Sequence, residues 1–139
     1  MSSEIAKPDM CNNATLIGFD TSGVKGTLAI FNALNGAVSL DDANIAELDC
    51  VGIATRADTQ VDPLTSVERP CIATTLIGSN GTSYFSRSAG IAKSARNLCD
   101  ALVASFGGWP ENTTIKLEFK STELAGKKTW KYFDAVPVD

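Results

Sequence analysis

Three observations predict a mainly β domain with one α-helix. Short runs rich in β-branched residues are separated by turn-forming pairs such as Asn80-Gly81, which is typical of strands and hairpins. Only residues 87–106 carry apolar side chains at three- and four-residue spacing, which is the period of a helix. The chain has 139 residues, of which 44% are hydrophobic and 20% charged, so it can bury a core of its own. We therefore expect a flexible polar arm at 1–13 and one domain at 14–139.

The first half of the chain is expected to supply mostly strands. The apolar run at 14–19 predicts a short additional strand. Residues 24–32 alternate in polarity and predict a strand with Lys25 and Phe31 on its outward face. Residues 45–56 predict a long strand, and their poor alternation indicates either a strand covered on both sides or one that bends between two sheets. The polar residues 57–70 are expected to form an unusually long loop.

The second half is expected to hold the helix between strands. A β-branched run at 71–78 is followed by the Asn-Gly turn and a short strand at 83–85. Ser86 is a suitable N-cap for the helix at 87–106, which Gly107-Gly108 ends. Strands at 113–121 and 128–136 then form a closing hairpin that turns around Gly126.

Setting aside the additional strand at 14–19, the expected order of elements is β-β-β-α-β-β. This is the order of the OB-fold, a five-stranded Greek-key barrel whose helix lies between the third and fourth strands. The predicted fold class is therefore an OB-fold-like five-stranded barrel with one helix and an extra N-terminal strand. Many OB-folds bind oligonucleotides, but a fold by itself does not decide the ligand.

Residues suited to catalysis or metal binding are missing or dispersed. The chain has no His, which removes the usual general base and the Ser-His and Cys-His pairs. Its four cysteines form no Cys-x-x-Cys pair that would indicate a zinc site. We therefore expect a protein that is not an enzyme and has no catalytic residue, no metal ligand and no cofactor. The cysteines are interpreted as reduced thiols: Cys11, Cys50, Cys71 and Cys99.

Charge and hydropathy limit where the protein acts. No apolar run approaches the roughly 18 residues of a membrane span, and the N-terminus lacks the apolar segment of a signal peptide. We therefore expect no membrane partner and a location in the cytoplasm. The net charge is −4, but residues 1–70 hold four basic and ten acidic side chains, whereas residues 71–139 hold eight and six. The basic excess lies on the later elements, where a polyanion would bind.

Cations and aromatic rings alternate along residues 116–133. Such a ribbon suits a surface that contacts phosphates and stacks bases. It is also typical of an amphipathic hairpin whose rings fill a core and whose lysines face water. From this stretch alone the second interpretation is favoured.

Three further segments resemble a known family. They are Gly18-Phe19-Asp20-Thr21 with residues 25–33, residues 74–77 and 81–84 with the helix through Leu102, and residues 115–119 with 126–133. Together they cover about half of the chain. In these segments the chain resembles the single-stranded-DNA-binding proteins of small tailed phages that replicate linear DNA from a protein primer. It departs from them in the longer polar segment at 57–70 and the longer N-terminal arm.

This resemblance implies a protein without catalysis that coats and protects displaced single strands during phage DNA replication, in the host cytoplasm. The residues proposed to stack on bases are Phe31, Tyr84, Trp130 and Tyr132. The residues proposed to contact phosphates are Lys25, Arg87, Lys116, Lys120, Lys128 and Lys131. Strand parity does not place all ten on one face, so some of these assignments must be wrong.

Two other partners are open at the level of sequence. The arm at 1–13 offers a contact to another copy of the chain, which would make a homo-oligomer. The acidic first half also fits a protein–protein interaction module, such as a virion component or an inhibitor of a host protein.

Overall fold

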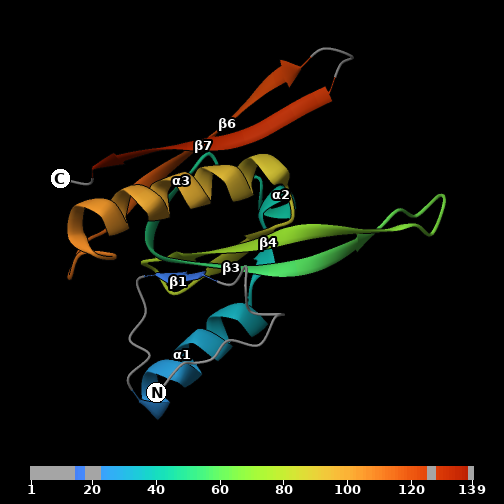
Figure 1. The fold of residues 1–139 in the computed structure, drawn as a ribbon. Coiled ribbons are helices and arrows are strands. Elements are labelled where there is room, and N and C mark those ends of the chain that lie inside the picture. The colour runs from blue at the N-terminus through green and yellow to red at the C-terminus, as the bar shows by residue number, and fades with distance from the viewer. Residues whose placement is uncertain (1–14, 18–22, 125–127, 138–139) are drawn as a thin grey trace.

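The computed structural model describes residues 15–17, 23–124 and 128–137 (Figure 1). The predicted arm at 1–13 lies outside these residues. The elements are β1 (Thr15–Ile17), α1 (Val24–Asn35), β2 (Val38–Ser39), α2 (Leu40–Ala43), β3 (Glu47–Val61), β4 (Glu68–Gly78), β5 (Ser83–Ser86), α3 (Ala89–Phe106), β6 (Ile115–Leu124) and β7 (Lys128–Pro137).

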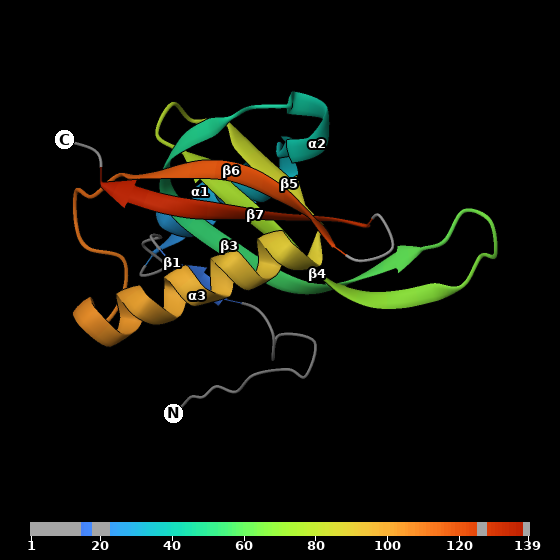
Figure 2. The same ribbon diagram turned by 90° about the horizontal axis from the view of Figure 1, so that it is seen from above.

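The strands form one sheet in the order β2-β5-β4-β3-β6-β7, and β1 pairs with β3. The sheet curls into a half-barrel around α3 (Figures 1 and 2). β3 joins the two halves, because Cys50 pairs with Gly78 of β4 on one side and Ile115 of β6 on the other. The register shifts between Cys50 and Gly52, and such a bulge bends a strand. The long bent strand and the OB-fold-like, mainly β fold class are confirmed.

The β-β-β-α-β-β order holds for β3, β4, β5, α3, β6 and β7. The predicted first strand at 24–32 is wrong, because Val24–Asn35 is helix α1. Ala and Leu favour a helix here, and Val24, Leu28 and Phe31 follow the helical spacing i, i+4, i+7, whereas alternation placed Phe31 on the face opposite Val24 and Leu28. A period-two pattern over nine residues therefore did not separate the two structures.

The predicted long loop at 57–70 is also wrong. β3 and β4 continue past the sheet as a two-stranded hairpin that projects from the molecule (Figure 1). At its tip the Asp62 carboxylate accepts a hydrogen bond from the Leu64 backbone N–H (2.8 Å), and Ser66 adopts a positive φ of 60°. An Asp that bonds the backbone two residues on makes a tight turn, so the polar segment is turn and strand. From here on, the arm means residues 58–70 and not the predicted N-terminal segment at 1–13.

The core lies between the inner face of the sheet and α3. Its buried residues are Leu40, Leu48, Cys50, Ile53, Leu76, Ile91, Ala95, Cys99, Leu102, Leu117 and Phe133. The helix begins at Ser88, whose Oγ accepts from the Ile91 N–H, rather than at the predicted Ser86. It ends at Gly107, which has a left-handed φ of 78° that favours glycine. Burial raises the pKa of the Cys50 and Cys99 thiols to about 11, so both stay neutral.

The first half of α3 runs along the free edge of β7. The Phe133 N–H donates to Ser94 Oγ (3.3 Å), and a Cβ at Gly90 would overlap the Lys131 carbonyl oxygen. An uncovered edge strand can pair with another chain, and α3 covers this one. Helix and hairpin are therefore held in a fixed relation. No helix that the structure describes is long and apolar enough to cross a bilayer.

Candidate nucleic-acid interface

Two hairpins, the arm and β6–β7, project from the same side of the half-barrel (Figures 1 and 2). In OB-folds the corresponding two loops flank the oligonucleotide site. Two cavities lie at the roots of these hairpins, of about 750 Å³ and about 230 Å³. Asp41 of α2 lines both cavities, so the two adjoin.

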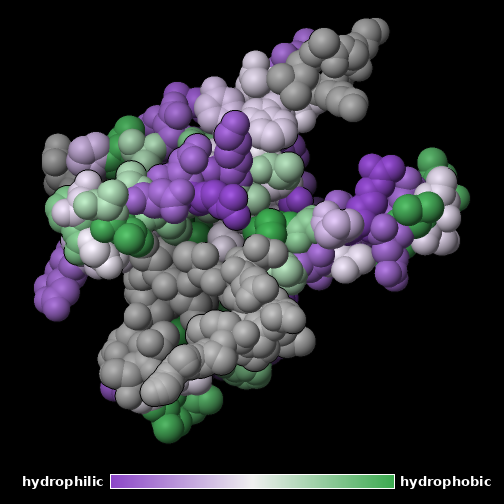
Figure 3. Space-filling view, viewed as in Figure 1, coloured by the Kyte–Doolittle hydropathy of each residue, from purple (hydrophilic) through white to green (hydrophobic). Residues whose placement is uncertain are grey.

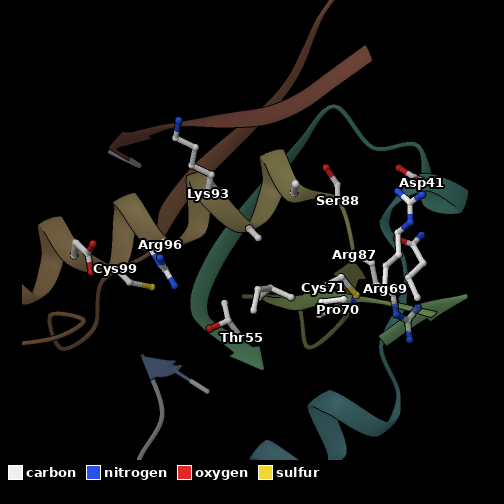
Figure 4. Close-up of a pocket in the computed structure, with 15 residues that line it drawn as sticks. Asp41, Thr55, Arg69, Pro70, Cys71, Arg87, Ser88, Lys93, Arg96 and Cys99 are labelled. Atoms are coloured by element: carbon white, nitrogen blue, oxygen red, sulfur yellow. The ribbon is translucent and has the colours of Figure 1, made fainter. Parts of the chain in front are cut away.

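The larger cavity lies between α3 and the root of the arm. It is lined by four cations, Arg69, Arg87, Lys93 and Arg96, and by the acids Asp41 and Asp100; we call it the cationic groove. Arg96 points from α3 toward the sheet, and Lys93 points the other way along the exposed side of the helix (Figure 4). Hydrophilic residues also gather over α3 between the two hairpins (Figure 3). The cations of the groove therefore come from the root of the arm and from two different sides of α3.

Arg87 is held in place at the rim of the groove. Its Nε lies 2.8 Å from Asp58 Oδ2, and its guanidinium lies 5.4 Å from the centre of the Phe85 ring. A hydrogen bond from the Thr59 N–H, and then the Arg87 guanidinium, hold the pKa of Asp58 below its ordinary value of 3.8. The ionised carboxylate thus stabilises the fold above pH 3.8, and this contribution is lost as the pH falls through the lowered pKa.

The smaller cavity lies between α2, the start of α3 and the β6–β7 hairpin. Its lining includes Lys120, Lys131 and Tyr132. Both lysines already have carboxylate partners: Lys131 Nζ lies 2.7 Å from Asp41 Oδ1, and Lys120 Nζ lies 2.7 Å from Asp134 Oδ2. The hydrogen bond to Asp134 raises the pKa of Lys120. By contrast, Arg69, Lys93 and Arg96 form no ion pair with any residue that the structure describes.

Residues 10–132 match the sequence family described as phage single-stranded DNA-binding protein, of the phi29 type. The match covers most of the chain. The chain belongs to this family. No curated protein and no solved structure matches it. The members of the family are non-enzymatic proteins that bind single-stranded DNA, and the resemblance seen in the sequence is confirmed.

In this phage single-stranded-DNA-binding protein, five of the ten predicted site residues gather between the two hairpins. Arg87 lines the larger cavity, and Lys120, Lys131 and Tyr132 line the smaller one. Trp130 shares the outer face of the hairpin with Tyr132, since they pair with Thr122 and Lys120 of β6. The Trp130 ring is half-buried beside Gly90 of α3, so one part of it packs and the other faces water.

The other five do not join them. Lys25 and Phe31 lie on α1, below the sheet and away from α3 (Figure 1). Tyr84 pairs with Leu76 and packs against the core. Lys116 lies on β6 beside Glu47 (3.8 Å), in the ladder to β3 rather than at the hairpin tip. Lys128 pairs with Leu124 through its backbone, and its side chain lies outside the described residues.

The structure adds candidates that the sequence did not single out. Arg69 was assigned to a loop, and its place beside α3 depends on the pairing of Gln60 with Arg69 in the arm. Lys93 and Arg96 lie off the apolar stripe of α3, a signal that was present in the sequence. Among the residues that the structure describes, no group of acids and cysteines could hold a metal ion.

Proposed function

We propose that this protein coats single-stranded DNA independently of its sequence, protecting strands displaced during phage DNA replication in the host cytoplasm. The observation that carries the proposal is the cationic groove between the arm and α3, in a chain of this family. Three of its cations form no ion pair with any carboxylate of the residues that the structure describes. They can therefore exchange counterions for phosphates without breaking an ion pair.

We infer that the strand runs from the cationic groove over the start of α3 to the outer face of β6–β7. Phosphates would meet Arg69, Arg96 and Lys93, and bases would stack on Tyr132 and Trp130. Stacking uses the flat face that every base has, and phosphates carry no sequence information. Binding by these two means is independent of sequence, as coating a displaced strand requires.

A salt series with matched variants tests the proposal. One variant, Arg69→Gln/Arg96→Gln, removes two charges from the groove; its control, Lys25→Gln/Lys116→Gln, removes two charges elsewhere. Titration of a homopolymer short enough to hold one copy, followed by Trp fluorescence, gives the slope of log K against log salt without any contribution from contacts between copies. The groove variant should lower the magnitude of the slope by about 1.4, at about 0.7 per phosphate, and the control should change it much less. Equal changes in both variants would contradict this site.

Protection is tested separately. At saturating protein, the homopolymer should resist a single-strand nuclease, and the groove variant should lose this protection at salt concentrations where the parent keeps it. Full digestion of a strand that fluorescence shows to be saturated would remove coating from the function.

A further inference from the structure

Two of the exposed apolar patches among the described residues lie away from α3, which itself exposes Val103 and Phe106. The first, at the tip of the arm, consists of Val61, Leu64 and Val67; Leu64 is 92% exposed. The second is a stripe on α1 made by Val24, Leu28 and Phe31. These residues follow the i, i+4, i+7 spacing of one helix face. The five side chains other than Leu64 are between 50% and 75% exposed, and patches of this kind mark sites of association.

The two patches cannot meet within one chain. The tip lies at the far end of the arm, and α1 lies under the sheet (Figure 1). Apolar surface is visible at both places in Figure 3, at the end of the arm and at the base of the molecule. The opposite face of α1 is turned to the protein, where Ile30 is buried and the Ala33 carbonyl accepts from Ser83 Oγ. The apolar stripe therefore takes no part in packing α1 against the sheet.

Charges around the two patches are complementary. Between Thr59 and Glu68 the tip carries Asp62 and Glu68 and no cation. Between Val24 and Asn35 the helix carries Lys25 and no acid. Two acids on one element and a single lysine on the other favour contact between the two patches and disfavour contact of the arm tip with itself.

We propose that the arm tip of one copy docks on the α1 stripe of the next copy. This contact uses two different surfaces, so it can repeat from copy to copy, and it produces a line of copies where the rotation between neighbours does not close a ring. The root of the arm borders the cationic groove, so the line would follow a bound strand. Here the inference rests on the proposed function. Contacts between neighbouring copies add to the affinity for a long strand, and a strand that holds only one copy gains nothing from them.

The test compares a homopolymer that holds one copy with one that holds many. Leu64→Ser and Leu28→Ser change one side of the contact each, at exposed positions that contribute little to folding. Each should weaken binding to the long strand by about ten-fold, the equivalent of one lost apolar anchor, and leave the short strand within about two-fold. Unchanged long-strand affinity in both variants would overturn the proposal, as would equal losses on both strands, which would place the tip on DNA.

A charge exchange makes the test specific. Lys25→Glu alone should weaken long-strand binding, and Lys25→Glu/Glu68→Lys should restore it, because each copy then presents the exchanged pair to its neighbour. If Leu28→Ser instead lowers stability and the exchange restores nothing, the stripe is covered by another segment of the same chain and the proposal fails.

Cross-linking separates this inference from DNA binding. With a mild oxidant added to accept the two electrons of each disulfide, a chain carrying both Leu64→Cys and Phe31→Cys should form disulfide-linked ladders longer than dimers at high protein concentration without DNA, whereas each single variant should not. Ladders from a protein that does not bind a short oligonucleotide would uphold the contact and remove the DNA function. The absence of ladders, together with normal short-strand binding, would do the reverse.

Discussion

The arm and the β6–β7 hairpin have the same topology but different surroundings. β6–β7 is anchored in the core by Leu117, Phe119 and Phe133. The rings of the two Phe side chains meet edge to face with their centres 6.1 Å apart, and α3 covers the free edge of β7. In the part of the chain that the structure describes, no third strand pairs with the outer half of the arm and no helix packs over it, so nearly all its side chains are exposed.

The charges of the two hairpins differ in the same way. The lysines of β6–β7 whose side chains are described, Lys116, Lys120 and Lys131, each lie beside a carboxylate. At the root of the arm Arg69 has none among the described residues. The comparison teaches that the hairpin with the most lysines need not be the one with the most available positive charge. The β6–β7 hairpin offers aromatic rings in fixed positions. The arm offers a cation without an ion pair among the described residues, and an apolar tip.

The largest expected effect concerns the anchoring of β6–β7. Gly90→Ala places a methyl group against the backbone carbonyl of Lys131 and against Trp130, so α3 must move away from β7. Overpacking of this kind should lower the free energy of unfolding by about 3 kcal/mol, measured by urea denaturation. The matched control, Gly108→Ala, meets nothing within 4 Å and should change it far less. Equal stabilities would show that the helix and hairpin are not held together at this point.

The next effect concerns the rings. Tyr132→Leu and Trp130→Leu keep apolar bulk but lose stacking, which contributes about 1–3 kcal/mol per base. Each should weaken binding to a short homopolymer by about ten-fold and by more than any single Lys→Ala. Phe31→Leu, on α1, serves as the control and should bind as the parent does. A larger loss with Phe31→Leu than with Tyr132→Leu would move the stacking surface to α1.

A smaller effect, opposite in sign, is expected from Asp41. This carboxylate binds Lys131 and lines both cavities. Asp41→Asn should strengthen DNA binding by about three- to ten-fold, because it frees Lys131 and removes a negative charge facing the phosphates. Asp42→Asn makes the same change in net charge one residue away, outside both cavities, and should strengthen binding less. Equal gains would mean that only net charge matters.

The smallest effect is expected from pH. The chain has no His, the lowered pKa keeps Asp58 ionised, and burial raises the pKa of the Cys71 thiol at the groove. None of these groups changes charge between pH 5.5 and 7.0, so affinity and salt slope should be constant across this range in fluorescence titrations. A steep rise or fall would require a titrating group outside the described residues.

Sequence reasoning was most successful where a pattern had one explanation. The stripe of α3 was long enough to exclude a strand, and the Gly107 stop and the β6–β7 alternation were equally clear. It failed at α1, where a run of nine residues was interpreted as the alternation of a strand although its apolar residues also follow helical spacing. It also failed in the arm, where the polar residues of two strands resembled a loop. Of the site, it found Arg87, Lys120, Trp130, Lys131 and Tyr132 and missed Arg69, Lys93 and Arg96. Arg69 lies near the two α3 residues only because the pairing of β3 with β4 places the root of the arm beside the helix.

The amino-acid sequence by itself determined the family, the place of the main helix before the closing hairpin, and the presence of rings and cations on that hairpin, because these follow from residue types and their spacing. Only the tertiary structure decided which cations have carboxylate partners. Asp41 and Lys131, or Asp58 and Arg87, are far apart in the chain, and a charge is available to phosphate or already neutralised according to what folding places within a few ångströms of it.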